Sequence, residues 1–382
     1  MIWFAVFIAF LYLGVILFLR AGLLKIARKN SSDPLTFSIV IAARNEEENI
    51  RECLDSIFSQ TVKLDRYEVI VVNDRSTDAT AAILEEFQGR FANFSVITVS
   101  DVPSGMSPKK HAVSKGVDAA RNEIIVFTDA DCVVPPTWLT SINTYFSSDV
   151  GLVQGITSYR YISGMNKLFF GLQAVDFLSH GIVAAAAIGA NLPINSNANN
   201  FAFRKKVFQE IDGYGDTAGR VVSGDDDLLL QRVWKSKKWR VVFMADSAAT
   251  VHTNPTPTIS QAFEQRKRWG SKTVHYCAPQ VALLSSVFIF YLLILISAVL
   301  SPFQTSFLPV LLGSALVKVF GESLLMIPGT RIFGKTELRP YIPLASLIQL
   351  PVVVSAVFMG VFGRFGWKGQ SFKRTVKRES QL

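Results

Sequence analysis

Apolar stretches near both ends of the chain constrain its fold most, because each is long enough to cross a membrane. Residues Met1–Leu19 carry no charged side chain, and about 20 apolar residues span the hydrocarbon core of a bilayer. Three further apolar stretches follow near the C-terminus: Val281–Leu300, Phe307–Ile327 and Tyr341–Phe362. Hydrophobic residues make up 49% of the chain, so we expect a membrane protein with a polar domain between these stretches.

Basic residues beside the apolar stretches predict the orientation in the membrane. Arg20, Lys25, Arg28 and Lys29 follow the first stretch, whereas a signal peptide would place positive charge before its apolar run. We therefore expect an uncleaved anchor with the following domain in the cytoplasm, at the cell (inner) membrane. The net charge of +9 comes without an RNA- or DNA-binding motif. It indicates anionic lipids or phosphorylated ligands, and no nucleic acid partner.

The C-terminal topology contains a conflict. Three complete spans after a cytoplasmic domain would place the tail Arg364–Leu382 outside, but its six basic residues and one acid favour the inside. Either the segment Tyr341–Phe362, which contains Pro351, is re-entrant or lies on the surface, or the charge rule fails. We favour the first. Lys318 and Glu322 stand at i and i+4 in the preceding stretch, so they can pair away from lipid.

The middle of the chain alternates between apolar strands and helical patterns. Segments with apolar residues at helical spacing lie between four predicted strands, which are Phe37–Ala42, Tyr67–Val72, Phe94–Val99 and Ile124–Phe127. This alternation predicts an α/β domain whose mainly parallel sheet is covered by helices on both faces. Gly151–Tyr159 favours a further strand. Leu168–Ala190 contains Asp176 and His180 and favours a buried or interfacial helix rather than a span.

Acidic residues follow two of the predicted strands. Asp74 comes after the second strand, and Asp129 and Asp131 come after the fourth. Since ligands of parallel sheets bind at the carboxyl ends of the strands, we expect these acids at one edge. Asp129 and Asp131 offer the hard oxygen ligands that suit Mg²⁺ or Mn²⁺ shared with phosphate oxygens. For the Asp-X-Asp pattern alone, a solvated turn is the alternative.

Two later segments also concentrate polar groups. Asp225, Asp226 and Asp227 open a helical stretch, where mutual repulsion would raise a pKa and the helix N-terminus would lower it. Gln265, Arg268 and Trp269 share one helix face. A guanidinium beside an aromatic ring suits phosphates and rings, although a basic helix lying on lipid headgroups is the alternative.

In this order, the segments resemble glycosyltransferase family 2. The resemblance is to its membrane-embedded branch with a Gln-X-X-Arg-Trp motif, which includes ceramide glucosyltransferase and the cellulose and hyaluronan synthases. It covers roughly residues 35–276. Val40–Glu47 is similar to the opening strand of the family, with Ala42 where a proline is usual, and Asn73–Asp78 resembles its Asp-Asp-X-Ser-X-Asp run, with Asn73 replacing the first acid. Thr128–Asp131 resembles the Asp-X-Asp motif.

The remaining motifs follow the same pattern. Gly224-Asp225-Asp226 is similar to the [Thr/Gly]-[Glu/Asp]-Asp motif, whose last acid is the catalytic base, and Gln265–Trp269 fits Gln-X-X-Arg-Trp without departure. The resemblance implies a GT-A fold with a mixed, mainly parallel sheet. The implied domains are an anchor at 1–29, a cytoplasmic transferase domain at 35–276, C-terminal transmembrane or re-entrant helices at 281–363 and a basic tail at 364–382.

The resemblance also implies roles for individual residues. Asp226 would be the base that deprotonates the acceptor hydroxyl, with Asp225 beside it as the alternative on physical grounds, and direct displacement would invert the anomeric configuration. Asp129 and Asp131 would hold a divalent metal, Mg²⁺ or Mn²⁺, on the diphosphate. The expected nucleotide-sugar-binding residues are Ala42, Glu46, Asp74, Lys110, Asp129, Gln265, Arg266, Arg268 and Trp269.

Two functions fit these features. The first is transfer of one sugar, most often from a uridine diphosphate sugar, to a lipid or membrane-associated acceptor. The alternative is a processive polysaccharide synthase, for which the few C-terminal spans make a thin channel unless several copies associate. A non-catalytic sugar-nucleotide-binding protein is disfavoured by the intact acids. We expect the three cysteines to be reduced thiols, and His252 to be structural rather than a metal ligand.

Overall fold

The computed structural model describes residues 2–26, 29, 33–215, 219, 224, 226–270, 276–362, 364–367 and 370–373. Asp225, one of the two predicted catalytic acids, lies outside these residues. The chain divides into two compact units. The larger comprises Phe18–Pro255 and Leu325–Pro340, and the smaller comprises Met1–Leu17, Thr256–Leu324 and Tyr341–Leu382.

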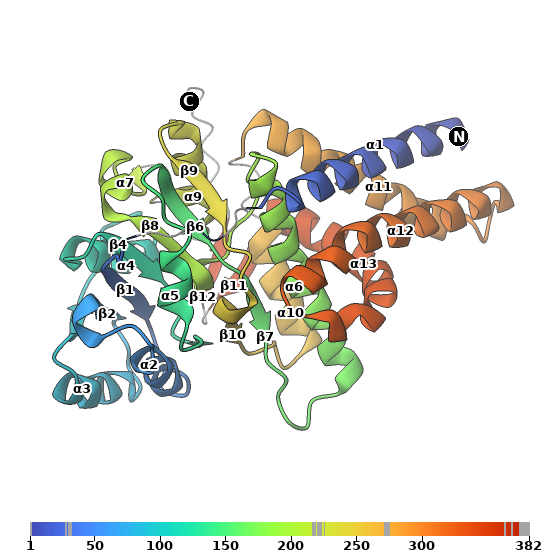
Figure 1. Ribbon diagram of the computed structural model, residues 1–382. Coiled ribbons are helices and arrows are strands. Elements are labelled where there is room, and N and C mark those ends of the chain that lie inside the picture. The colour runs from blue at the N-terminus through green and yellow to red at the C-terminus, as the bar shows by residue number, and fades with distance from the viewer. Residues whose placement is uncertain are drawn as a thin grey trace. The chain divides into compact units, whose positions relative to one another are not determined.

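The larger unit is built on a mixed sheet, shown in Figure 1. In the described part of the chain this sheet has seven strands in the order β3-β2-β1-β4-β8-β6-β9. Its strands are β1 (Phe37–Ala43), β2 (Tyr67–Asp74), β3 (Phe94–Val99), β4 (Ile124–Phe127), β6 (Val150–Gln154), β8 (Phe201–Arg204) and β9 (Arg240–Phe243). Strands β1 to β4 are parallel, β8 is antiparallel to β4 and β6, and β9 is parallel to β6. The predicted mixed, mainly parallel sheet is confirmed.

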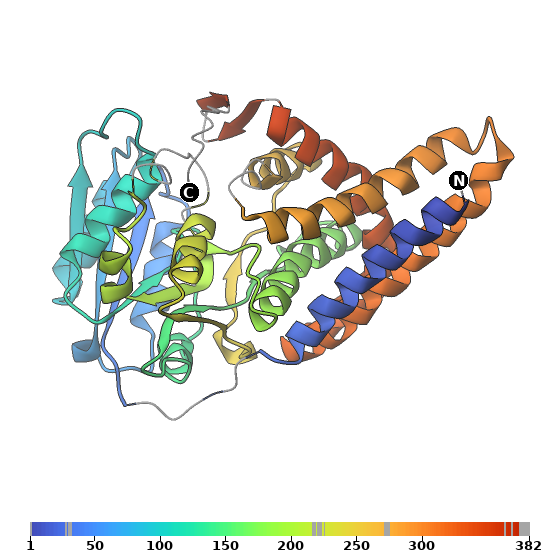
Figure 2. The same cartoon turned by 90° about the horizontal axis from the view of Figure 1, so that it is seen from above.

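Helices cover both faces of this sheet (Figure 1 and Figure 2). One face packs against α2 (Ile50–Phe58), α3 (Thr80–Arg90) and α5 (Trp138–Asn143), and the other against α4 (Pro108–Ala119), α7 (Lys205–Glu210) and α9 (Asp227–Ser236). Side chains of β1 point alternately to the two faces of the sheet. Ile39 and Ile41 lie in the core under α2, α3 and α5, and Val40 lies in the core under α4, α7 and α9. Burial on both faces is also why the strands read as continuous apolar runs.

A second, smaller sheet was not predicted. Its order is β5 (Cys132–Val133), β10 (Val251–Thr253) and β7 (Thr157–Tyr159). The segment Gly151–Tyr159, predicted as one strand, therefore supplies β6 to the main sheet and β7 to the small one. The strand is interrupted at Gly155, where a Cβ atom would lie 2.4 Å from Asn200 Nδ2. Only glycine leaves room for the amide of Asn200 at this point.

Helix α6 (Lys167–Gly189) packs closely against other backbone segments of the larger unit. A Cβ atom on Gly22 would lie 2.0 Å from the Ala186 carbonyl oxygen, and one on Gly189 would lie 2.1 Å from the Gly22 carbonyl oxygen. Such contact between helix backbones requires small residues, which accounts for the Gly- and Ala-rich second half of α6. This helix is half buried, as predicted, but its length and composition would also allow it to cross a membrane.

Five helices in the described residues are long and apolar enough to span a membrane. They are the segments Ile2–Leu23, Lys167–Gly189, Ala278–Leu300, Thr305–Ile332 and Thr336–Met359. The first forms α1, and the last three correspond to α11 (Ala278–Leu300), α12 (Leu308–Ile332) and α13 (Ile342–Phe362). Helices are thus present at all four predicted apolar stretches. Helix α13 continues through Pro351, so this proline does not end it.

The smaller unit contains α10 (Ile259–Gly270), which packs against α13. Tyr12 of α1 stacks on Phe290 of α11 with ring centroids 4.2 Å apart. A short hairpin, β11 (Arg364–Trp367) and β12 (Gln370–Lys373), follows α13. Apolar side chains of α1, α11, α12 and α13 form one buried cluster in this unit.

One ion pair lies among these apolar helices. The ammonium of Lys318, which has no exposed surface, bonds to Glu322 of the same helix. The Glu322 carboxylate also accepts a 2.6 Å hydrogen bond from the Tyr291 hydroxyl, and the Lys318 ammonium lies 4.2 Å from the Tyr291 ring centroid. The predicted pairing of Lys318 with Glu322 is confirmed.

Candidate active site

The carboxyl end of β2 carries Asp74, which is buried. Its carboxylate accepts a 2.8 Å hydrogen bond from Arg75 Nε, and Arg44 Nη1 lies 4.0 Å away. Arg44 follows β1, the neighbouring strand, so two strand ends meet at this acid. Two guanidinium groups therefore lie beside this carboxylate, which was predicted to bind the nucleotide sugar.

The turns after β1 and β2 are tied together. The Asn45 side chain accepts a 2.8 Å hydrogen bond from the Thr77 amide, and the Glu46 amide donates a 2.8 Å bond to Thr80 Oγ1. The Glu46 carboxylate accepts from Asn49. These bonds fix the loop after Ala42, so the predicted positions Ala42, Glu46 and Asp74 lie at one edge of the sheet.

Asp129 and Asp131 follow β4 at the same edge. Lys109, near the start of α4, places its ammonium 2.7 Å from Asp129 Oδ1. Lys110, the predicted donor-binding lysine, is instead fully buried, with its ammonium 5.6 Å from the Tyr214 ring centroid. Lys109 is therefore the lysine seen on the carboxylate pair, and a role for Lys110 in donor binding stays a prediction.

The environment of Asp131 disfavours its negative charge. The residue is exposed on one side, yet burial of the carboxyl group and repulsion from Asp129 and Glu46 raise the pKa of Asp131 to about 6. Lys109 opposes this effect only in part. One ammonium therefore does not cancel the repulsion that Asp129 and Glu46 exert on Asp131, and a cation would relieve it.

This donor set fits a divalent metal. Two carboxylates from the protein leave the remaining positions of an octahedral ion for phosphate oxygens and water, as is common for Mg²⁺. No group of three or more His, Cys, Asp or Glu side chains within the described ranges is arranged to hold a metal ion. Asp129 and Asp131 would thus be the share of the protein in a site completed by a ligand.

Asp226 occupies the N-cap position of α9. It is buried, and its carboxylate accepts a 2.7 Å hydrogen bond from the Asp227 amide. Gly224 precedes it with a φ of 79°, a backbone conformation that favours glycine. The bond to the helix N-terminus holds the carboxylate at a fixed place, as a general base requires.

The polar loop Asn195–Asn200 connects this acid to the carboxylate pair. The Ser196 amide donates to the carboxylate of Asp227, next to Asp226. Asn199 Nδ2 lies 2.9 Å from the sulfur of Cys132, next to Asp131. One short loop thus contacts the neighbours of both predicted functional acids, which brings the start of α9 to the strand end that carries Asp131.

Two cysteines lie beneath the carboxylate pair. Cys53 Sγ is 3.6 Å from the Asp129 carbonyl oxygen, and Cys132 follows Asp131 directly. Burial raises the pKa of both thiols, and the carboxylates of Asp131 and Asp129 raise it further. Both cysteines are free and protonated, which agrees with the expected reduced thiols.

Helix α10 of the smaller unit carries the Gln265–Trp269 segment. The Arg266 guanidinium lies 4.3 Å from the Trp269 ring centroid and donates a 2.6 Å hydrogen bond to Gln265 Oε1. Arg266 thus lies over the Trp269 ring, a contact that the sequence pattern did not indicate. Donor binding by Gln265, Arg266, Arg268 and Trp269 stays a prediction.

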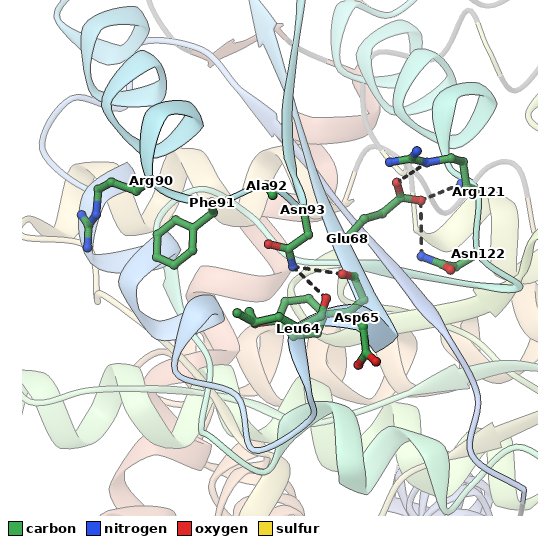
Figure 3. A pocket seen from close by; sticks show the side chains of 10 residues that line it. Leu64, Asp65, Glu68, Arg90, Phe91, Ala92, Asn93, Arg121 and Asn122 are labelled. Atoms are coloured by element: carbon green, nitrogen blue, oxygen red, sulfur yellow. Dashed lines mark hydrogen bonds and ion pairs between the residues drawn. The ribbon is translucent and has the colours of Figure 1, made fainter.

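A surface depression of about 490 Å³ lies at the opposite, amino end of the sheet (Figure 3). Figure 3 shows Glu68 turned toward Arg121 and Asn122 across this depression. The Glu68 carboxylate accepts 2.6 Å hydrogen bonds from Ser38 Oγ and the Arg121 amide. Burial opposes its charge, but these bonds and the Arg121 guanidinium outweigh burial, so the pKa of Glu68 is lowered. None of the predicted site residues lines this depression.

Comparison with known proteins identifies related sequences. A sequence model described as "Glycosyltransferase like family 2" matches residues 34–271. The glycosyltransferase AglE of Haloferax volcanii is 31% identical over 128 residues, which is 33% of this chain and 41% of that protein. The beta-monoglucosyldiacylglycerol synthase of Synechocystis is 26% identical over 240 residues, or 60% of this chain and 46% of that protein. The chain spans about half the length of these curated relatives.

A solved structure shares the fold. The mannosyltransferase PcManGT from Pyrobaculum calidifontis, in complex with GDP-Man and Mn²⁺, superposes with a TM-score of 0.55 and 17% sequence identity. The match covers 91% of this chain and 97% of that chain. Together with the order of the strands, it confirms the expected GT-A fold.

Proposed function

Because this chain belongs to the family 2-like glycosyltransferases, whose model covers residues 34–271, we propose that it transfers a sugar from a nucleotide diphosphate sugar to a lipid. The donor most in keeping with the sequence motifs is a uridine diphosphate sugar. The acceptor atom is a hydroxyl of a lipid or membrane-associated molecule. The transferase domain faces the cytoplasm at the inner membrane, and the apolar helices anchor it.

The observation that carries this proposal is the charge at the carboxyl end of the sheet. Burial and repulsion from Asp129 and Glu46 disfavour the charged form of Asp131 and raise its pKa to about 6. The Lys109 ammonium bonds to Asp129. A metal-bound diphosphate satisfies both features. When Mg²⁺ or Mn²⁺ is bound to Asp129 and Asp131, it neutralises negative charge that develops on the leaving diphosphate.

The residues of the chain would share the remaining work. Asp74 accepts a hydrogen bond from the base of the nucleotide, with its carboxylate oriented by Arg75 and Arg44. Lys109 can turn from Asp129 toward the phosphates once a metal is bound. Asp226 takes the proton from the acceptor hydroxyl, which attacks the anomeric carbon from the side opposite the diphosphate and inverts its configuration.

Two kinds of relative support a lipid acceptor. The Synechocystis relative is named for the synthesis of a glucosyldiacylglycerol. The 4,4'-diaponeurosporenoate glycosyltransferase of Staphylococcus aureus is 36% identical over 118 residues, or 31% of this chain and 29% of that protein. Five candidate membrane helices would bring the acceptor to the enzyme. The alternative, a processive polysaccharide synthase, would need a channel through these few helices.

A transfer assay with the full chain tests the proposal. Purified protein is incubated with a panel of radiolabelled nucleotide sugars, Mg²⁺ or Mn²⁺, and total membrane lipids. We expect label in the organic phase in a single product of low mass. Label in a polymer would favour the alternative, and equal transfer by wild type and Asp226→Asn would overturn the mechanism.

A further inference from the structure

Three basic side chains gather beside the small sheet of the larger unit, and the mechanism above uses none of them. They are Arg160, which follows β7, His252 of β10, and Lys335, which follows α12. The Arg160 amide donates a 3.0 Å hydrogen bond to the Thr253 carbonyl oxygen, which holds Arg160 against β10. We refer to Arg160, His252 and Lys335 as the basic cluster.

Packing in the larger unit brings Lys335 to this sheet. Phe333 packs against Phe243 of β9, with ring centroids 5.6 Å apart. A Cβ atom on Gly334 would lie 3.3 Å from Ser247 Cβ, in the turn just before β10. Both contacts fix the chain just before Lys335, and the charge of Lys335 acts on His252, so the two side chains lie near each other although they are far apart in sequence.

His252 has an unused polar atom inside this cluster. Its Nδ1 is buried and has no hydrogen-bond partner among the residues that the structure describes. Burial and the positive charges of Lys335 and Arg160 lower the pKa of His252, so the ring is neutral. A buried ring nitrogen without a partner is costly, and as an N–H group it can donate to an anion.

Lys335 has little negative charge near its ammonium group. It is half-buried, and burial lowers its pKa, which Glu337 counteracts only in part. No ion pair of Lys335 occurs within the described part of the chain. Arg160, in contrast, binds both carboxylate oxygens of Glu52 and donates a 2.6 Å bond to Asn254 Oδ1. The positive charge of Lys335, beside His252, is therefore not matched by an ion pair in the described part of the chain.

The location of the cluster indicates where the missing anion comes from. Lys335 follows directly after the candidate membrane span Thr305–Ile332, and residues just beyond a span lie at the level of lipid headgroups. The small sheet also adjoins the candidate metal site, since Thr253 Oγ1 lies 3.5 Å from the Asp131 carbonyl oxygen. An anion attached to an apolar tail fits between the headgroup level of the membrane and the candidate metal site.

We propose that Lys335 and His252, beside Arg160, bind the phosphate group of the acceptor, which is therefore a phosphorylated lipid. The Lys335 ammonium and the His252 N–H donate to the phosphate oxygens, while Arg160 stays paired with Glu52. This inference rests on the proposed transfer to a lipid and narrows its substrate class. It concerns acceptor binding only, so donor binding and the base Asp226 are unaffected by the cluster.

Binding to short lipid analogues tests the site without catalysis. The full chain, purified in a phosphate-free maltoside detergent, is titrated calorimetrically with dodecyl phosphate, dodecanol and inorganic phosphate. We expect dodecyl phosphate to bind most tightly, and Lys335→Gln to bind it about ten-fold more weakly or worse, the effect of losing one charge-assisted hydrogen bond. Lys335→Arg keeps most of the affinity. Lys206→Gln, which removes an exposed lysine, leaves it unchanged.

Several outcomes would overturn the inference. Equal binding of dodecyl phosphate and dodecanol would exclude a phosphate site, and equal binding by wild type and Lys335→Gln would exclude this one. Equal binding of dodecyl phosphate and inorganic phosphate would assign the cluster to a free anion instead of a lipid. His252→Gln is a second variant, expected to weaken dodecyl phosphate several-fold, in case Lys335→Gln folds poorly.

A transfer assay separates this inference from the proposed function. With a phosphorylated lipid as acceptor, we expect Lys335→Gln to raise the acceptor KM about ten-fold while the donor KM stays the same. If the wild type uses only lipids without phosphate, this inference fails while the proposed function stands. If no lipid accepts label, the proposed function fails, and the inference fails with it.

Discussion

Glu68 and Asp131 lie at opposite ends of the main sheet and experience opposite electrostatic environments. Both residues lie on the main sheet or just after one of its strands, yet the pKa of Glu68 is lowered and that of Asp131 is raised to about 6. Glu68 accepts hydrogen bonds from Ser38 and Arg121, whereas Asp131 faces Asp129 and Glu46. The charge of Glu68 is satisfied within the fold, and the charge of Asp131 requires something that the fold does not contain.

This difference separates a structural acid from a ligand-binding one. A carboxylate with a full set of donors stabilises the native state, and its removal leaves those donors unpaired. A carboxylate held near other carboxylates costs stability and is typical of a functional site. Variants at the two ends of the sheet should therefore affect opposite properties, activity at the carboxyl end and stability at the amino end.

The largest effect is expected for Asp226→Asn, a change in the candidate active site that should affect activity rather than stability. Loss of the general base should lower the rate of sugar transfer about 10²–10⁴-fold. Asparagine still caps a helix N-terminus, so the melting temperature in detergent should stay near that of the wild type. The check is a radiolabel transfer assay beside a thermal melt. A large drop in melting temperature would instead show that Asp226 is structural.

If Asp131 is a metal ligand as proposed, Asp131→Asn should lower the rate of transfer about 100-fold. Without divalent metal, the variant should melt no lower than the wild type, because its repulsion with Asp129 and Glu46 is gone. Addition of Mn²⁺ with a nucleotide diphosphate should stabilise the wild type and not the variant. Metal-independent activity in Asp131→Asn would refute the metal site.

Glu68→Gln should show the opposite behaviour. An uncharged amide cannot accept all the bonds from Ser38 and Arg121, so we expect a loss of about 2 kcal/mol of stability with little change in the rate of transfer per folded molecule. Glu86→Gln is the matched control, because Glu86 forms an exposed ion pair with Arg51, and its loss should lower the stability far less than Glu68→Gln. Equal melting temperatures for the two variants would contradict the comparison.

The smallest effect concerns pH. Because the pKa of folded Glu68 lies below its ordinary value of 4.5, its contribution to stability is complete above that value. The contribution is lost as pH falls through the lowered pKa of the folded state. The difference in melting temperature between wild type and Glu68→Gln should therefore be constant from pH 7 to pH 5 and shrink below about pH 4.5. A difference that grows toward acid pH would give the wrong sign for Glu68.

Much of the fold could be predicted because its strands have strong periodic signals. The four parallel strands are apolar runs buried on both faces, and alternation with helices places their carboxyl ends together, which is how Asp74 and Asp129 could be assigned to one edge. Strand β5 is too short to carry a pattern, so the second sheet was missed. Helix α6 has small residues that contact Gly22, and no local pattern distinguishes such packing from contact with lipid.

The site was only partly accessible from sequence for a similar reason. The choice between Lys109 and Lys110 depends on the rotation of α4 about its axis, which places one on Asp129 and the other beside Tyr214. The basic cluster joins Arg160, His252 and Lys335 through tertiary packing alone. Its only sequence signal is a lysine placed just after an apolar stretch, which the positive-inside pattern already explained.

The bond between Lys318 and Glu322 bears on how this protein is assembled in the cell. Both partners stand one turn apart on α12, so the bond can close as soon as that helix forms, before any neighbouring helix is present. The segment can then enter the bilayer without net charge, and Lys318 does not act as a retention signal on either side. If α12 spans a membrane, we expect its insertion not to depend on α11, whose Tyr291 donates a further hydrogen bond to Glu322.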